Sequence, residues 1–168
     1  MDNSRQTIHG EMMNNTEFRL VASRSEFEAL DELLWEVLWK PIGLPRNIRD
    51  SFKIEGEGVD IVALCGENVV GGLVANWVFP IEVELRHLAV IPEAQGNKVG
   101  SNLVKKLISM ASQRNCLTLW TISRNTSTQF FKKLGFKPGA EKVPDHPSFK
   151  KHGISFEKLE FMCKTNTP

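Results

Sequence analysis

A strand, a proline turn, a helix and a second strand follow one another between residues 82 and 122, and this passage restricts the fold most strongly. Apolar residues dominate Glu82–Ile91, and Pro92 ends that segment. Apolar residues at helical spacing then predict a helix over about Lys98–Arg114, and an apolar strand follows over Cys116–Ile122. A strand–helix–strand crossover joins parallel strands, so the sheet is expected to contain a parallel pair.

The segments on either side of this passage predict further strands and helices. Before it we expect a strand over Phe18–Ala22, a helix from a Ser25–Glu28 capping box to about Lys40, a short helix over Arg46–Phe52, and hairpin strands Val59–Cys65 and Val69–Phe79. The Gly71-Gly72 pair indicates a bulge or a close backbone approach. After it we expect a helix over Thr126–Leu134 and a strand over Ile154–Cys163. The order predicts a mixed α/β (α+β) domain with a mostly antiparallel sheet and helices on both faces.

Length and charge place the chain among ordinary globular domains. Its 168 residues suit one domain, which we expect over residues 17–164 after a flexible, polar arm at residues 1–16. The formal net charge is only +1, and no basic stripe is present, which argues against a nucleic-acid-binding domain.

Cysteine usage and hydropathy indicate in which cellular compartment the protein works. Cys65, Cys116 and Cys163 are odd in number and contain no CxxC pair, so neither a disulfide framework nor a zinc site is expected. No metal is predicted, since the histidines have no ligand spacing. The polar first residues lack the hydrophobic core of a signal peptide, and no apolar run approaches the roughly 18 residues of a membrane span. We therefore expect a cytoplasmic protein with no membrane or nucleic-acid partner.

The turn between residues 92 and 101 combines two glycines with the start of a helix. Amides at a helix N-terminus lack intrahelical partners, and Gly96 and Gly100 allow close approach by an anion. The spacing excludes both the GxxxxGK[ST] phosphate loop and the GxGxxG dinucleotide fingerprint. These residues alone leave two alternatives open, a phosphate site and an ordinary strand-to-helix turn.

Two blocks of this sequence resemble the GNAT acetyltransferase superfamily. Leu88-Ala89-Val90-Ile91-Pro92, with Gln95, Gly96 and Gly100, is similar to its central strand and loop motif. Asn125 followed by Phe130-Phe131-Lys132-Lys133-Leu134-Gly135-Phe136 resembles its Asn…Phe-Tyr-x-x-x-Gly-Phe block. Together the blocks cover about Val83–Phe136. The resemblance implies a GNAT fold and an N-acetyltransferase that moves an acetyl group from acetyl-CoA to an amine.

The resemblance also implies roles for individual residues. Glu84 is the candidate general base, with the alternative that it is only a strand-surface carboxylate paired with Arg86, and the Leu88 amide polarises the thioester carbonyl. Strand alternation places Glu84 and Arg86 on one face and His87 on the other. The residues expected to bind acetyl-CoA are Leu88, Ala89, Val90, Gln95, Gly96, Asn97, Lys98, Val99, Gly100, Ser101, Asn125 and Phe131.

Two positions depart from the family pattern. Lys98 stands where glycine is usual, and it can offer its amide provided that its φ is negative. Phe131 stands where the family usually has a tyrosine that protonates the leaving thiolate, and the chain contains no tyrosine. Three explanations stay open: water donates the proton, a hydroxyl such as Ser123 or Thr126 replaces the tyrosine, or the protein binds acetyl-CoA without turnover.

The acceptor side is less well defined by sequence. We expect a primary amine of a small molecule as the acceptor, and the residues considered for its pocket are Trp39, Arg46, Trp77 and Arg86. The tryptophans have the alternative role of core residues, and Arg46 that of a surface residue. A homodimer is a further expectation, since an exposed last strand can pair across an interface.

Overall fold

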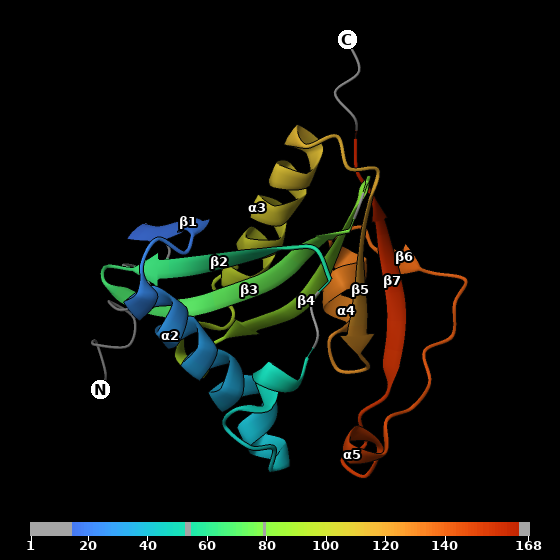
Figure 1. Cartoon of the computed structure of the whole chain (residues 1–168), viewed down its shortest axis with the longest axis horizontal. Coiled ribbons are helices and arrows are strands. Elements are labelled where there is room, and N and C mark those ends of the chain that lie inside the picture. The colour runs from blue at the N-terminus through green and yellow to red at the C-terminus, as the bar shows by residue number, and fades with distance from the viewer. Residues whose placement is uncertain (1–14, 53–54, 79, 165–168) are drawn as a thin grey trace. The chain divides into compact units, whose positions relative to one another are not determined.

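A seven-stranded sheet organises the chain, with the strand order β1-β2-β3-β4-β5-β7-β6 (Figure 1). The strands are β1 Thr16–Leu20, β2 Glu57–Cys65, β3 Asn68–Val78, β4 Glu82–Val90, β5 Thr118–Arg124, β6 Lys137–Pro138 and β7 Phe156–Met162. β1 pairs antiparallel with β2, and β7 pairs antiparallel with both β5 and β6, whereas β4 and β5 are parallel. The predicted parallel crossover within a mixed sheet is therefore confirmed.

This computed structural model describes residues 15–52, 55–78 and 80–164, which group into two compact units. The first unit contains residues 15–52, 59–74 and 87–107, and the second contains residues 55–58, 75–78, 80–86 and 108–164. Most of the predicted arm lies outside the described residues, but its last residue, Thr16, already begins β1. A single domain over residues 17–164 stays a prediction.

Short helices connect the strands. They are α2 Arg24–Leu34, the π-helix η1 Trp35–Trp39, the 3₁₀-helices η2 Lys40–Ile42, η3 Ile48–Ser51 and η4 Pro92–Ala94, and the α-helices α3 Val99–Gln113, α4 Thr128–Lys133 and α5 Pro147–Lys150. The helix predicted to end at Lys40 has about the right extent, but its last part changes hydrogen-bonding pattern. The short helix predicted over Arg46–Phe52 is the 3₁₀ turn η3.

The capping box predicted at Ser25 and Glu28 is wrong by two residues. Ser23 is the N-cap of α2, and its hydroxyl accepts a hydrogen bond from the Glu26 amide at 3.2 Å. The Glu26 carboxylate reaches back to the Ala22 amide at 2.8 Å. Arg19 of β1 binds the same carboxylate at 2.6 Å, and this contact from another element favours the earlier cap.

Within the first unit, helices cover both faces of β3. A Cβ on Gly71 would lie 3.0 Å from Val99 Cγ1 of α3, whereas a Cβ on Gly72 would collide with Leu30 of α2. Successive strand residues point to opposite faces, so α2 and α3 lie on opposite sides of the sheet here. The predicted close backbone approach is confirmed, and burial on two faces explains why β3 is apolar almost throughout.

In the second unit, α4 packs through aromatic rings. Phe131 lies 5.2 Å from Phe136 between ring centroids, and Phe136 lies 5.4 Å from Phe161 of β7. β5 begins and ends two residues later than predicted, at Thr118 and Arg124. These contacts hold α4 against β7. Phe161 is the register partner of Leu119 on β5, so Trp120, the next residue of β5, points to the opposite face of the sheet.

Candidate active site

The loop between β4 and α3 presents a run of unpaired main-chain amides. The Gln95 amide donates to the Pro92 carbonyl at 3.3 Å, and the Asn102 amide donates to the Lys98 carbonyl at 2.9 Å. Between them, the amides of residues 96–101 donate to no acceptor within the described part of the chain. These amides sit at the positive end of the α3 dipole, which suits a phosphate group.

Two side chains of this loop donate hydrogen bonds to main-chain carbonyl groups of β4 and η4. Gln95 Nε2 donates to the Val90 carbonyl at 3.1 Å, and Asn97 Nδ2 donates to the Ala94 carbonyl at 3.3 Å. Neither side chain accepts a hydrogen bond from the loop amides. The unpaired groups described above are therefore main-chain amides, and the Gln95 and Asn97 side chains support their arrangement.

Lys98 has a left-handed backbone conformation, so the condition of a negative φ is not met. Its φ is +62°, close to the +83° of Gly96 two residues earlier. A non-glycine residue in this region carries strain of about 1–2 kcal/mol. The loop thus keeps the shape that a glycine would give, at some cost in stability.

The parallel pairing of β4 with β5 covers only the first part of each strand. Glu82–Leu85 pair with Thr118–Thr121, while β4 continues to Val90 and β5 continues to Arg124. Leu88 and Val90 therefore lie on the part of β4 beyond the parallel register.

Glu84 of β4 is a partly buried carboxylate in the second unit. Its side chain is 15% exposed, and its Oε2 lies 3.4 Å from Arg86 Nη1. Burial raises the pKa of Glu84 above its usual value, while the charges of Arg86 and Lys158 and the Asn76 amide oppose that rise. A carboxylate with a raised pKa is a stronger base, which suits the removal of a proton from an amine.

Three other residues around Glu84 were missed by the sequence analysis. Trp120 of β5 is the register partner of Glu84, and Lys158 Nζ of β7 lies 4.6 Å from the centre of the Trp120 ring. Asn76 of β3 is 1% exposed, and its Nδ2 donates to the Glu55 carbonyl at 2.8 Å. Strand alternation could have suggested Trp120, but only the strand register brings it to Glu84.

Asn125 and Phe131 are both engaged within the second unit. The Asn125 side chain donates to the Gly153 carbonyl at 3.2 Å and accepts from the Ser155 amide at 3.3 Å. Phe131 is 4% exposed and packs on Phe136. Contacts of Asn125 and Phe131 with acetyl-CoA stay predictions.

Ser123 was considered as a replacement for the missing tyrosine. Its side chain is buried, and its Oγ donates to the Arg124 carbonyl at 2.9 Å. This bond uses the only proton of the hydroxyl, which argues against Ser123 as the proton donor.

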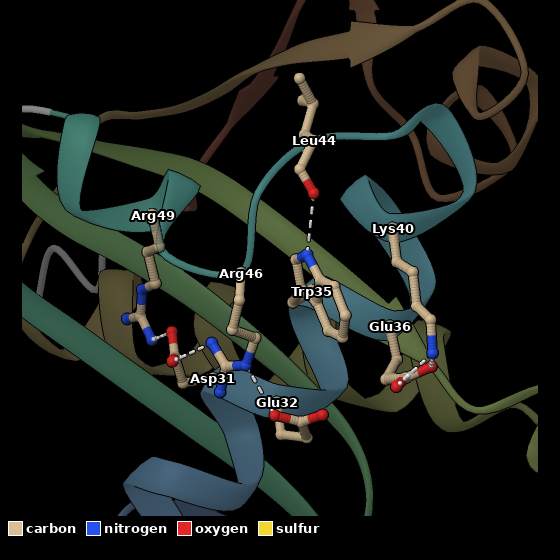
Figure 2. A network of polar contacts seen from close by, with 8 residues as sticks. All are labelled: Asp31, Glu32, Trp35, Glu36, Lys40, Leu44, Arg46 and Arg49. Atoms are coloured by element: carbon tan, nitrogen blue, oxygen red, sulfur yellow. Dashed lines mark hydrogen bonds and ion pairs between the residues drawn. The ribbon is translucent and has the colours of Figure 1, made fainter.

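Arg46 belongs to an ion-pair network in the first unit (Figure 2). Its Nη1 lies 2.7 Å from Asp31 Oδ2, and its Nε lies 2.7 Å from Glu32 Oε2. Trp35 anchors the same loop, because its Nε1 donates to the Leu44 carbonyl at 3.0 Å. Binding of a substrate by Arg46 stays a prediction, and the substrate would have to displace the Asp31 and Glu32 carboxylates from the guanidinium.

The two tryptophans considered for the acceptor pocket are packed against protein groups. Trp39 is 2% exposed and lies 5.0 Å from His87 and 5.5 Å from Phe52 between ring centroids. In the second unit, the Arg114 guanidinium lies 4.2 Å from the centre of the Trp77 ring. These contacts favour the alternative role of both tryptophans as core residues.

The described residues also bear on metal binding and on membrane insertion. No group of three or more His, Cys, Asp and Glu side chains there is arranged to hold a metal ion. None of the helices within the same residues is long and apolar enough to cross a membrane.

Comparison with known proteins gives one family match and many structural matches. The model of the acetyltransferase (GNAT) family matches residues 24–136. An aminoglycoside 6'-N-acetyltransferase complexed with coenzyme A is 15% identical, with 90% of this chain and 99% of that chain covered and a TM-score of 0.73.

Two other solved structures show the same fold. The ribosomal-protein-S18-alanine N-acetyltransferase from Escherichia coli is 15% identical, with 90% of this chain and 96% of that chain covered and a TM-score of 0.71. The PaiA N-acetyltransferase from Thermoplasma acidophilum, in complex with coenzyme A, is 16% identical, with 88% and 99% covered and a TM-score of 0.66.

Proposed function

Because the chain belongs to the GNAT acetyltransferase family, we propose that it transfers the acetyl group of acetyl-CoA to a primary amine of a small molecule. The observation that carries this proposal is the run of unpaired amides at residues 96–101, at the start of α3. Those amides bind the diphosphate of acetyl-CoA, and the positive end of the helix dipole strengthens the binding. The Lys98 ammonium adds a positive charge at the same loop.

Residues of β4 hold the reactive end of acetyl-CoA. Main-chain groups of Leu88, Ala89 and Val90 bind the pantetheine arm as a neighbouring strand would, and the short parallel register of β4 supports this role. The Leu88 amide donates to the thioester oxygen, where negative charge develops during attack.

Glu84 acts as the general base. It takes a proton from the ammonium of the acceptor, and the resulting amine nitrogen attacks the carbonyl carbon of the thioester. The nitrogen–carbon bond forms as the carbon–sulfur bond breaks, and water donates a proton to the departing thiolate. The raised pKa of Glu84 supports this role.

The setting of the reaction is part of the same proposal. Cys65, Cys116 and Cys163 are all free thiols, which fits a reducing cytoplasm. We propose that residues 17–164 act as one catalytic domain at this location, and that the domain forms a homodimer.

Acetyl-CoA turnover tests this function directly. Purified protein is incubated with acetyl-CoA and a panel of primary amines, and acetylated amine is detected by mass spectrometry. We expect acetylated product for at least one amine, with no product when the protein is omitted. Absence of acetyl-CoA binding by calorimetry would reject the assignment of residues 96–101.

Phe131 favours a second candidate function, a non-catalytic acyl-CoA-binding module. The side chain that replaces the tyrosine is buried and has no hydroxyl group to protonate a thiolate. The same experiment separates the two functions, because a binding module would bind acetyl-CoA in the calorimeter and acetylate none of the amines.

A further inference from the structure

The residues around Glu84 carry three buried polar atoms that lack hydrogen-bond partners within the described part of the chain. They are Asn76 Oδ1, Arg86 Nε and Trp120 Nε1. Buried polar atoms in folded proteins are nearly always paired, so each unpaired atom calls for an explanation. All three belong to the second unit and come from three different strands, β3, β4 and β5.

Side-chain contacts and strand register tie these atoms to one cluster. Arg86 lies 3.4 Å from the Glu84 carboxylate, and Trp120 is the register partner of Glu84 on β5. Register partners in a parallel pair project to the same face of the sheet. The Asn76 amide contributes to the pKa of Glu84, so it also lies beside this carboxylate. We call Asn76, Glu84, Arg86 and Trp120 the Glu84 cluster.

The cluster offers two kinds of hydrogen-bonding group. Arg86 Nε and Trp120 Nε1 are donors without acceptors, and the first belongs to a cation. Glu84 and Asn76 Oδ1 are acceptors, and the first is an anion. An ammonium group satisfies the acceptors, and the oxygens of a carboxylate satisfy the donors.

We propose that the acceptor substrate is an amino carboxylate, with the carboxylate close to the amine, and that Arg86 and Trp120 bind that carboxylate. This inference rests on the proposed acetyl transfer and names the substrate class of the same site. Asn76 Oδ1 and Glu84 receive the ammonium, and Glu84 then takes its proton. The amine nitrogen forms the new bond to the acetyl carbon as the carbon–sulfur bond breaks, while the carboxylate stays unchanged.

Other charges near the cluster also bear on specificity. Lys158 lies over the Trp120 ring and pairs with Glu141 at 3.1 Å, and Glu160 is the β7 register partner of Trp120. A polyamine would place further ammonium groups beside Arg86 and Lys158, where like charges repel. The cluster therefore favours a zwitterion over a polycation.

Matched pairs of substrates test the proposal. Alanine is compared with ethylamine, phenylalanine with phenethylamine, and both amino acids with their amides and with spermidine. We expect kcat/KM to be about 10- to 100-fold higher for the amino acids, the range typical of a hydrogen-bonded charge. Equal or greater turnover of the amines, the amides or spermidine would overturn the proposal and leave acetyl transfer itself intact.

Trp120→Phe removes the indole donor and keeps an aromatic ring. We expect KM for the amino acid to rise about 10-fold or more, while KM for acetyl-CoA stays unchanged. Trp35→Phe is the matched control, since the Trp35 indole already donates to the Leu44 carbonyl. An equal rise in KM for both variants would contradict the assignment of Trp120.

A binding measurement covers the case in which no amine is acetylated. The indole N–H signals are followed by ¹⁵N NMR, with and without coenzyme A, and the Trp120 signal is assigned with Trp120→Phe. We expect alanine or phenylalanine to shift the Trp120 signal and leave the Trp35 signal unchanged, whereas ethylamine shifts neither. A shift without turnover supports the carboxylate site and rejects acetyl transfer, and an unmoved Trp120 signal overturns the inference.

Discussion

The loop at residues 95–101 and the Glu84 cluster offer different kinds of hydrogen-bonding group. The loop offers main-chain amides, and its Gln95 and Asn97 side chains donate to main-chain carbonyl groups of β4 and η4. The Glu84 cluster offers side-chain groups from three strands, and three of their polar atoms are buried and unpaired within the described residues. A main-chain site depends on backbone shape and tolerates many side chains, whereas a side-chain site depends on the identity of each residue.

The largest effect on activity is expected at Glu84. Glu84→Gln should lower kcat by about 10²- to 10⁴-fold, because removal of a general base has this effect, while acetyl-CoA binding stays unchanged. Activity of the unaltered protein should rise as pH rises through the raised pKa of Glu84, and the variant should lose this rise. Steady-state kinetics between about pH 5 and pH 9 measure both effects.

Glu84→Gln should not lower the free energy of unfolding, although it lowers kcat. A carboxyl whose pKa is raised by folding disfavours the folded state when it is charged, and this effect fades as pH falls through the raised pKa. The variant should therefore unfold no more easily than the unaltered protein at pH 7. Glu82→Gln on the same strand is the control, and a similar loss of activity there would contradict the role of Glu84.

The next largest effect is expected at the two glycines of β3. Gly71→Ala places a methyl group 3.0 Å from Val99 and 3.2 Å from the Ala89 carbonyl, so the start of α3 must shift. We expect a loss of about 1–3 kcal/mol in the free energy of unfolding and a higher KM for acetyl-CoA. Chemical denaturation and kinetics measure the two quantities.

Gly72→Ala is the matched control on the opposite face. Its methyl group collides with the end of the Leu30 side chain of α2, away from the loop. We expect a loss of stability with little change in KM for acetyl-CoA. If both variants raise KM equally, the loop does not depend on the local packing beneath Val99.

Sequence reasoning succeeded where the relevant residues are close together in the chain. The strand, turn and helix start at residues 88–101 form one continuous motif, whereas the role of Glu84 came from the family resemblance and stays a prediction. The π-helix η1 was missed, because the apolar spacing of Trp35–Trp39 fits an α-helix as well. Asn76, Trp120 and Lys158 were missed because their approach to Glu84 depends on strand register, which no local pattern reveals.

The N-terminal cap of α2 illustrates the same limit. Ser23 with Glu26 and Ser25 with Glu28 both have capping-box spacing, so local sequence does not choose between them. Arg19 decides, because it forms an ion pair with Glu26 at 2.6 Å from the preceding strand. The ion pairs of Arg46 were missed for a related reason, since its partners Asp31 and Glu32 are 15 and 14 residues away.

A smaller effect is expected at Lys98, and it sharpens the contrast between the two sites. Lys98→Gly should raise the free energy of unfolding by about 1 kcal/mol or less, because glycine adopts a φ of +62° without strain. If main-chain amides dominate binding, the affinity for acetyl-CoA should change little. Lys98→Ala keeps the strain and removes the charge, so a large loss of affinity in both variants would show that the ammonium dominates.

The smallest effect is expected at Glu26, a carboxylate whose pKa is shifted in the opposite direction from that of Glu84. The Arg19 side chain and the Ala22 amide lower the pKa of Glu26 to about 2, below its usual value of 4.5. A lowered pKa contributes stability that is complete above the usual value and is lost as pH falls toward the folded value. Glu26→Gln should therefore lower the melting temperature slightly at pH 7, and the difference should disappear as pH falls from about 5 to about 2. A difference that persists at low pH would mean that packing rather than charge stabilises this cap. In that case the different effects of Glu26→Gln and Glu84→Gln on stability at neutral pH would not be explained by the ion pair of Glu26 and the burial of Glu84.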